Sequence, residues 1–570
     1  MLQKLFMTAA IMAACIQTDA QTLATEYKGT SNNNPISPCV YCADPTALEY
    51  NGRLYVYGSN DHQQFIKNGK KGTNDYGDIK SIVVFSTDDM VNWTFHGTID
   101  TKKVCTSWGN GYFRSWAPSV TWRHNETTGK DEFFLYFANW ASNVGVLTAE
   151  SPIGPWKSPL TGPIVSGSTP GVNPCNWCFD PGVVIDENGT GWLTFGGGDP
   201  NAQGTDIQPN NAGIVKLKPS MTAVDGKAVK LPAPYHFEAS ELNVINGKYV
   251  YTYCSNWADR KDADWNKYKQ EKGINISKPE TCTMCYMVSD NPLDPNSWVY
   301  KGVYGPHPGS SPNNHSHLHK FNGKYYHIYH NGSLLEGMKS AKATTSDAST
   351  YRSICVDEIT VDESTQTISK ANLTSKGVSG IRMMDPYQLQ QAETMGNCGG
   401  VNYEDFTNIE KNTSVSTLGN DASRNMQVKM QAGSWINQKR VNFGSTGADR
   451  FTLRAKGTGT LEIRMGSKSL QAAATINFSS TAMEEQTIEI DASKFQGMKS
   501  VYFVVTAAED FYVDAWQFTE VGSTGIQPTA LTSHPSPLTS KNTYDLSGRR
   551  LSDTQHHHGI MIKNGKKIWH

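Results

Sequence analysis

Short runs in which apolar and polar residues alternate recur along the first two thirds of the chain, and Asn-Gly turns separate several of them. Residues 46–50 and 53–58 form such a pair, and both runs are rich in β-branched and aromatic side chains. This combination is typical of a β-hairpin. Asn51-Gly52 forms its turn, and further hairpins are predicted around the turns Asn188-Gly189, Asn246-Gly247 and Asn322-Gly323, and from residue 116 to residue 137.

Most of these hairpins are followed by a second pair of strand-like runs that ends near a tryptophan, as at Trp93, Trp156 and Trp298. Each unit therefore holds roughly four strands in about 60–75 residues, which is the pattern of a β-propeller blade. Five such units fit between residues 34 and 375. The sequence predicts an all-β fold that begins with a five-bladed β-propeller.

The first strand of each unit opens with a residue suited to chemistry. The motif Pro-Cys-x-x-Cys-x-Asp-Pro occurs at residues 38–45 and again at 174–181, which marks these two openings as repeats. The innermost strands of a propeller line its central channel, so the opening residues should converge at one end of it. Three carboxylates would meet there. The opening residues of the five units are Asp44, Trp116, Asp180, Glu238 and His315.

The amino-acid composition fits a chain with several cores and excludes one class of partner. Of the 570 residues, 38% are hydrophobic and 10% aromatic, which suffices for more than one folded domain. A formal net charge of −2 argues against a polyanionic partner, so we expect no nucleic acid to bind.

Residues 1–20 have the pattern of an export signal. Lys4 precedes a short apolar run at residues 5–14, which is too short to cross a bilayer. Cleavage after Ala20 would release a soluble protein, and this is the favoured reading. Residues 12–15 also resemble a bacterial lipobox, which would leave Cys15 lipidated. We expect no membrane span elsewhere and a secreted or surface-bound protein.

Eleven cysteines in an exported chain favour disulfides. Three Cys-x-x-Cys pairs stand out, and zinc ligation, redox chemistry or buried thiols are the alternatives. The pairs are Cys39/Cys42, Cys175/Cys178 and Cys282/Cys285.

A second domain is predicted at residues 386–520, after a linker at 377–385. Short alternating runs separated by Gly and Asn are typical of a β-sandwich or jelly roll. A Ser/Thr/Pro-rich linker near residues 525–540 then leads to a tail at 541–570.

The propeller region resembles glycoside hydrolase family 43, five-bladed propeller enzymes that act on plant cell-wall pentose polymers. The resemblance covers about residues 34–375 and depends on the order and spacing of several short motifs. These are Ala43-Asp44-Pro45-Thr46, residues 55–61, Trp116-Ala117-Pro118, Phe179-Asp180-Pro181, Phe237-Glu238-Ala239-Ser240, Asn314-His315 and residues 352–357.

The resemblance implies single-displacement hydrolysis with inversion and no cofactor for the chemistry. Asp44 matches the general base, Glu238 the general acid and Asp180 the carboxylate that tunes and orients the acid. Inverting hydrolysis needs an acid and a base separated by room for one water. Many family members have Gly-Pro after the acid, where this chain has Ala239-Ser240. Glu241 is therefore a competing acid, although strand alternation should direct it to the opposite face from Glu238.

Three further positions match substrate-binding or metal sites of this family. Trp116 matches a sugar platform, with a core role as the alternative. Arg352 matches a substrate-binding arginine, with a surface ion pair as the alternative. His315 matches an axial histidine near substrate that holds calcium, often through water. A packed histidine beside His317 and His319 is the alternative for that position, and a transition-metal cluster of the three is a weaker one.

Residues 386–520 resemble a carbohydrate-binding module of family 6. The match runs from Gln391-Ala392-Glu393 to residues 513–516, and it implies that Glu393 and Asp514 contribute to a structural calcium site. Sugar binding is the favoured role and a purely structural role the alternative. The tail at 541–570 resembles the C-terminal sorting tails of exported Bacteroidetes-type proteins, and a plain β-hairpin extension is the alternative.

Together these patterns predict an exported, monomeric, inverting glycosidase whose partner is arabinoxylan or xylan. Release of arabinose from arabinoxylan is the favoured activity. β-Xylosidase action on xylo-oligosaccharides comes second and endo-arabinanase action third. A propeller that only binds polysaccharide is the alternative from another class of protein.

Overall fold

The computed structural model describes residues 22–68, 72–173, 175–198, 207–344, 351–415 and 426–523, together with the backbone of four short strands beyond residue 540. The predicted signal, including Cys15, and the linker at 525–540 lie outside the described residues, as does most of the predicted tail.

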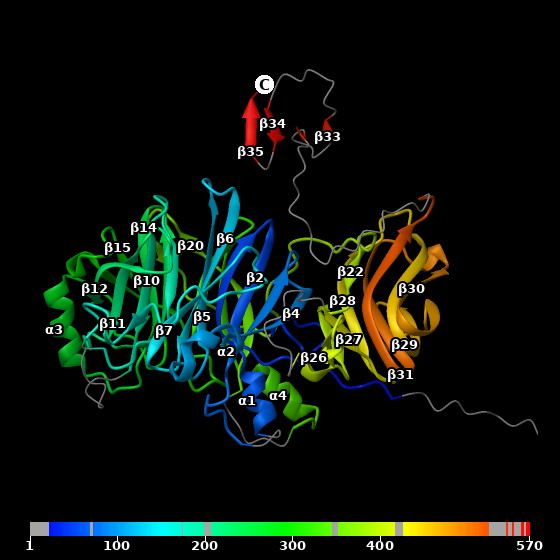
Figure 1. Ribbon diagram of the computed structural model, residues 1–570, viewed down its shortest axis with the longest axis horizontal. Coiled ribbons are helices and arrows are strands. Elements are labelled where there is room, and N and C mark those ends of the chain that lie inside the picture. Colours follow the sequence, from blue (N-terminus) through cyan, green and yellow to red (C-terminus); the bar gives the residue numbers. More distant parts are fainter. Residues whose placement is uncertain are drawn as a thin grey trace, which may run out of the picture.

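Both described domains are built from β-sheets, and the first of them is a five-bladed propeller (Figure 1). The innermost strands β1, β5, β9, β13 and β17 contact one another in a closed ring, so they surround one axis. The predicted fold is confirmed. The blades are β1 (Ala43–Tyr50), β2 (Arg53–Ser59), β3 (Ser81–Thr87), β4 (Trp93–Asp100); β5 (Trp116–Asn125), β6 (Lys130–Asn139), β7 (Asn143–Ala149), β8 (Val165–Ser166); β9 (Gly182–Ile185), β10 (Gly191–Gly196), β11 (Ala212–Leu217), β12 (Val224–Leu231); β13 (His236–Ile245), β14 (Lys248–Ser255), β15 (Met284–Ser289), β16 (Val299–Gly305); and β17 (Ser316–Phe321), β18 (Lys324–Asn331), β19 (Ser353–Ile359).

The segment just before β1 closes the ring. The fifth blade has three strands, and residues 34–42 run beside the outermost of them, β19. The backbone N–H of Ile36 donates to the carbonyl of Ile354 at 2.9 Å, and the N–H of Cys42 donates to that of Arg352 at 3.0 Å. Because this segment leads directly into β1, it ties the last blade to the first.

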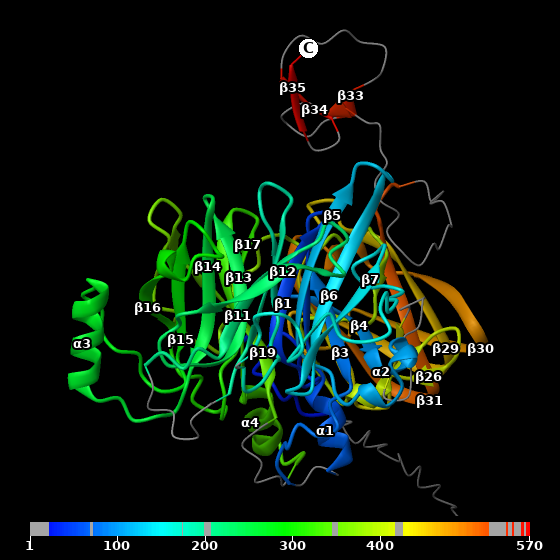
Figure 2. The same ribbon diagram turned by 60° about the vertical axis from the view of Figure 1, so that its left-hand side comes forward.

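Four short helices lie in the loops that connect the propeller strands, and two of them pack together at one end of the propeller (Figure 2). Helices α1 and α4 share an apolar cluster that includes Phe65, Leu334 and Tyr41. The helices are α1 (Asp61–Lys67), α2 (Thr101–Val104), α3 (Asp262–Lys272) and α4 (Ser333–Ser340), with 3₁₀ turns η1 (Thr106–Gly111), η2 (Pro295–Ser297), η3 (Tyr403–Asp405) and η4 (Ala492–Lys494). Among the described helices, none is long and apolar enough to span a bilayer.

Four of the five blades open with a residue in the left-handed backbone region. Asp44, Ala117, Asp180 and Ala239 have φ values of 49°, 38°, 47° and 62°. In β1, β5 and β13 the pairing register shifts at this point, as expected for a β-bulge. Bulges re-aim side chains and concentrate beside active sites. The strained positions therefore mark the end of the channel where chemistry is expected.

The C-terminal domain is one large curved sheet, seen beside the propeller in Figure 1. It belongs to the predicted β-sandwich class and is called the module below. Its strands are β22 (Gln390–Gln391), β24 (Asn397–Gly399), β25 (Phe406–Asn408), β26 (Thr413–Ser414), β27 (Met426–Lys429), β28 (Trp435–Asn442), β29 (Ala448–Met465), β30 (Ala474–Glu489) and β31 (Met498–Glu520).

The module is continuous with the first blade. Strand β23 (Thr394–Met395) pairs antiparallel with β4 and adds a fifth strand to that blade. One apolar core extends across the junction and contains Phe85 and Phe95 of the propeller with Phe406 and Met426 of the module. This burial of apolar surface holds the two domains together.

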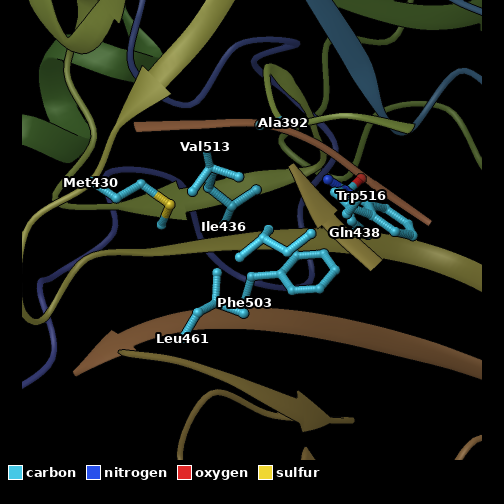
Figure 3. Close-up of a pocket in the computed structure, with 9 residues that line it drawn as sticks. Ala392, Met430, Ile436, Gln438, Leu461, Phe503, Val513 and Trp516 are labelled. Atoms are coloured by element: carbon cyan, nitrogen blue, oxygen red, sulfur yellow. The ribbon is translucent and has the colours of Figure 1, made fainter. Parts of the chain in front are cut away.

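Inside the module's core lies a void of about 10 Å³, lined almost wholly by apolar side chains (Figure 3). This space is at the lower limit for one water molecule and far below what a sugar needs. It is a packing gap and not a binding site. Beyond the module, the backbone of β32 (Thr543–Tyr544), β33 (Arg550–Leu551), β34 (Ile560–Lys563) and β35 (Lys566–Trp569) forms a small sheet in the predicted tail.

Candidate active site

A pocket of about 570 Å³ opens at the end of the channel where the innermost strands begin. All three predicted carboxylates line it, so the structure brings together residues nearly 200 positions apart in the chain. Its lining consists of Asp44, Tyr76, Trp116, Trp140, Ala141, Trp177, Phe179, Asp180, Phe237, Glu238, Trp257, Pro312, Asn313, His315 and Arg352.

Asp44 is buried, and its neighbours stabilise the ionised form of its side chain. Arg352 Nη1 donates to Asp44 Oδ1 at 2.6 Å, and Ser59 Oγ donates to Asp44 Oδ2 at 2.7 Å. Burial alone would raise the pKa of Asp44, but the charge of Arg352 and the hydrogen bond from Ser59 lower it below its usual value. Asp44 is therefore ionised at neutral pH and can accept a proton.

Glu238 has the opposite electrostatic environment. Its carboxyl group is desolvated and close to Asp180, and these two causes raise its pKa well above the usual value. Asp180 Oδ2 accepts the backbone N–H of Ala239 at 2.9 Å, which fixes Asp180 beside the acid. Burial, followed by the charge of Asp44, raises the pKa of Asp180 to about 8. Glu238 is thus protonated near neutral pH and able to donate.

Glu241 does not line the pocket. Its side chain is fully buried on the propeller axis, with Oε1 3.3 Å from His317 Nδ1 and Oε2 3.5 Å from Ser119 Oγ. The expectation that it points to the opposite face from Glu238 is wrong. The pairing register shifts between the two residues, and this irregularity turns both side chains inward at different depths.

The other predicted residues lie in the pocket wall. Arg352 is 2% exposed, which excludes a surface ion pair. It binds Asp61 through Nε and Nη2, both at 2.9 Å, as well as Asp44. His315 Nδ1 lies 3.9 Å from oxygens of both Asp44 and Asp180. Trp116 stacks at a tilt on Trp140, with 4.9 Å between ring centroids.

Several aromatic residues of the pocket had not been assigned from the sequence. Trp140, Trp177 and Trp257 are 36% to 43% exposed, which is unusual for tryptophan. Tyr76 lies on a loop with φ of 61° and its ring lies under the guanidinium of Arg352, 5.0 Å away. The loops that carry these residues have no periodic pattern. Only Trp177, inside the repeated Cys-x-x-Cys motif, could have been singled out from the sequence.

Buried polar atoms without protein hydrogen-bond partners collect on the propeller axis just below the pocket. They include His315 Nε2, and also Glu241 Oε1 and His317 Nδ1, which face each other at 3.3 Å without forming a hydrogen bond. His317 Nε2 and His319 Nδ1 lie 3.2 Å apart. Within the described residues, no group of three or more His, Cys, Asp or Glu side chains is arranged around a common metal position. The unpaired atoms fit ordered water or a hydrated cation better than a directly ligated transition metal.

In the module, the backbone N–H of Ala392 donates to the carbonyl of Asp514 at 2.8 Å, which places Glu393 beside Asp514. Burial and the charge of Asp514 raise the pKa of Glu393 well above its usual value. Glu393 Oε2 and Asp514 Oδ1 are buried without a hydrogen-bond partner. Arg454 donates to the other oxygen of Asp514 at 2.5 Å. Two adjacent carboxylates with unpaired oxygens fit a hard cation such as calcium.

The prediction of disulfides, whose pairing the sequence leaves open, is wrong for the described residues, because their ten cysteines are all free thiols. In the extended segment before β1, the two side chains of a pair enter different environments. Cys39 contacts Cys398 of the module, whereas Cys42 packs against Gly58 of β2, where any side chain would collide with its sulfur.

The comparisons with known proteins agree with this geometry. A sequence model of glycosyl hydrolases family 43 matches residues 32–364, and one of carbohydrate binding module (family 6) matches residues 391–520. An arabinoxylan arabinofuranohydrolase of Paenibacillus polymyxa is 34% identical over 509 residues, covering 86% of this chain and 74% of that protein. An arabinoxylan arabinofuranohydrolase of Bacillus subtilis (strain 168) is 35% identical over 522 residues, covering 88% and 95%.

One solved structure resembles both domains together. The crystal structure of a glycoside hydrolase family 43 arabinoxylan arabinofuranohydrolase from Bacillus subtilis, in complex with cellotetraose, is 33% identical with a TM-score of 0.75. The match covers 88% of this chain and 99% of that one. The chain therefore belongs to glycosyl hydrolase family 43, and it is a glycoside hydrolase that carries a carbohydrate-binding module of family 6.

Proposed function

We propose that this enzyme is an inverting α-L-arabinofuranosidase that releases arabinose side chains from arabinoxylan. One observation carries the proposal: a single pocket holds Asp44 with a lowered pKa and Glu238 with a raised pKa. Carboxyl groups whose environments push their pKa values apart can act as base and acid at the same pH. The two relatives named as arabinoxylan arabinofuranohydrolases support the choice of substrate.

The proposed reaction is one displacement at the anomeric carbon. Asp44 removes a proton from a water molecule as the water oxygen forms a bond to that carbon. Glu238 donates its proton to the departing glycosidic oxygen, so the bond to the xylan chain breaks. Asp180 keeps Glu238 protonated and, through the N–H of Ala239, holds the adjacent backbone in place.

The aromatic lining suits a pocket for a side-chain sugar within a longer groove. Trp116 and Trp140 form one aromatic pair, and Phe237 contacts both Trp177 and Trp257 to form a second group. Flat rings with exposed faces stack on the apolar faces of sugars. We assign Trp116 to the arabinose pocket and the more exposed tryptophans to the xylan chain, with Arg352 and His315 also contacting the bound sugar.

The module, the cations and export complete the proposal. The module would hold the enzyme on the polysaccharide, a calcium ion would bind Glu393 and Asp514, and a hydrated calcium ion would lie near His315. Such ions would stabilise the fold and take no part in bond cleavage. The leader-like residues 1–20 and the tail at 541–570 support an exported bacterial enzyme that acts outside the cell.

Product analysis tests the proposal directly. Purified protein is incubated with wheat arabinoxylan, linear xylo-oligosaccharides and debranched arabinan, and the released sugars are separated by chromatography. We expect free arabinose from arabinoxylan alone. Xylose from the linear oligomers would move the assignment to a β-xylosidase, oligosaccharides from arabinan would indicate an endo-arabinanase, and no released sugar would refute hydrolysis.

A further inference from the structure

A residue of the module touches the propeller directly behind the active site. Tyr403, in η3, is 1% exposed, and its hydroxyl oxygen accepts a hydrogen bond from Asn60 Nδ2 at 3.0 Å. Its ring stacks on the imidazole of His62 with 4.3 Å between centroids and 18° between planes. Asn60 and His62 flank the first residue of α1. One module side chain therefore holds both neighbours of Asp61.

Asp61 is the residue that holds Arg352 in place. It is fully buried, and its two carboxylate oxygens accept Arg352 Nε and Nη2 side by side, both at 2.9 Å. Asp61 Oδ2 also accepts the backbone N–H of Arg352 at 3.0 Å and Asn74 Nδ2 at 3.0 Å. A bidentate pair of this kind fixes the direction of the guanidinium plane.

With that plane fixed, the remaining nitrogen of Arg352 points at the proposed base. Nη1 lies 2.6 Å from Asp44 Oδ1. A continuous connection thus runs from Tyr403 to Asn60 and His62 by direct contact, from these two residues to Asp61 through the peptide bonds on either side of it, and from Asp61 to Arg352 and Asp44 by hydrogen bonds. Each contact is between buried groups, where a displaced partner is not replaced by water at low cost.

We propose that Tyr403 of the module is a positioning residue for catalysis, which places the Asp61–Arg352 pair so that Asp44 is correctly aligned. The inference rests on the proposed role of Asp44. The module is then part of the machinery of the propeller's active site and not only an anchor for polysaccharide. Substrate is not expected to touch Tyr403, since the residue is buried and does not line the pocket.

The test compares three variants of the full chain with the wild type. Tyr403→Phe removes the hydroxyl and keeps the ring, while Tyr403→Leu also removes the stacking on His62. Tyr387→Phe is the matched control, because the Tyr387 hydroxyl donates to the carbonyl of Phe443 within the module at 2.7 Å. Kinetics use a small aryl α-L-arabinofuranoside, whose binding does not need the module.

We expect kcat of Tyr403→Phe to fall about threefold to tenfold with KM unchanged, the range that loss of one buried hydrogen bond supports. Tyr403→Leu should lose more and Tyr387→Phe nothing. A merely structural role would leave the kcat of the folded fraction unchanged. Unaltered kcat in both Tyr403 variants, or an equal loss in Tyr387→Phe, would overturn the proposal.

Hydrogen exchange followed by mass spectrometry provides a readout that needs no substrate. In Tyr403→Phe, amide exchange should rise in the peptide that covers α1 and in the peptide that contains Arg352, whose N–H bonds to Asp61. Unchanged exchange in both peptides would refute the positioning role, even if the wild type proved inactive on every arabinoside. Product analysis of the wild type separately decides the proposed function.

Discussion

The assignment of Glu238 as general acid makes the sharpest prediction. Glu238→Gln keeps the shape of the side chain and removes the proton that it donates. General acid catalysis contributes roughly 10²-fold to 10⁴-fold, which is about 3 to 5 kcal/mol of transition-state stabilisation. Because the environment of Glu238 keeps it protonated near neutral pH, the whole of this contribution should be lost there.

Two substrates separate loss of the acid from general damage. A xylan hydroxyl needs a proton to depart, so release of arabinose from arabinoxylan should fall by the full factor. 4-Nitrophenolate departs without protonation, so hydrolysis of 4-nitrophenyl α-L-arabinofuranoside should fall by about tenfold or less. The alkaline limb of the pH profile, which reports the acid, should also disappear in the variant.

Glu241→Gln is the matched control on the same strand. Burial raises the pKa of Glu241 to about 8, so the amide replaces a side chain that is already neutral at pH 7. The ratio of the rates on the two substrates should stay at the wild-type value. The reasoning is refuted if Glu238→Gln hydrolyses arabinoxylan within tenfold of the wild type, or if the ratio changes in Glu241→Gln instead.

Three further predictions concern the neighbours of the acid, the groove and the module. Asp180 carries a negative charge above its pKa of about 8, and that charge raises the pKa of Glu238; Asp180→Asn removes it, so the alkaline limb of kcat/KM should move to lower pH, and an unmoved or raised limb contradicts that coupling. Trp140→Ala should raise KM for arabinoxylan about fivefold to tenfold and leave KM for the aryl glycoside unchanged, since stacking on a sugar contributes about 1 kcal/mol; equal effects on both substrates would place Trp140 in the arabinose pocket instead. A chelator should lower the wild-type Tm by several degrees and lower the Tm of Glu393→Ala by less, since a ligand that binds only the folded state stabilises it and the variant lacks one of the two proposed calcium sites; an equal response in both proteins would exclude calcium at Glu393 and Asp514.

The residues that open the blades were predictable because a propeller repeats. Asp44 and Asp180 occupy the same place in two copies of one motif, and repetition brings equivalent positions to one axis. The family resemblance then distinguished Glu238 from Glu241, and the structure agrees that only Glu238 lines the pocket. The argument from strand alternation failed for Glu241, because a register shift on β13 breaks the period of two.

Contacts between segments without a repeating pattern could not be predicted. Tyr76 reaches the pocket through a loop with a left-handed backbone, and Cys39 meets Cys398 across the junction of the two domains. Tyr403 and Asp61 lie 342 positions apart in the chain, as the sequence numbers show. Only the folded arrangement of propeller and module brings such residues together, so these contacts cannot be predicted from composition or periodicity.

The pairing of β23 with β4 also bears on whether the first blade can associate with other molecules. The outermost strand of a blade has one edge of unpaired N–H and C=O groups, and such an edge can recruit a strand from another molecule. Here Thr394 and Met395 cover part of that edge opposite Thr94 and Trp93, and the N–H of Phe95 donates to the carbonyl of Glu393. The module thus keeps part of the outer edge of the first blade paired, so that this part cannot bind a strand of another molecule. A propeller cut off before residue 386 would expose both a free strand edge and the apolar surface around Phe95, so aggregation, and not loss of sugar binding, would be its first defect.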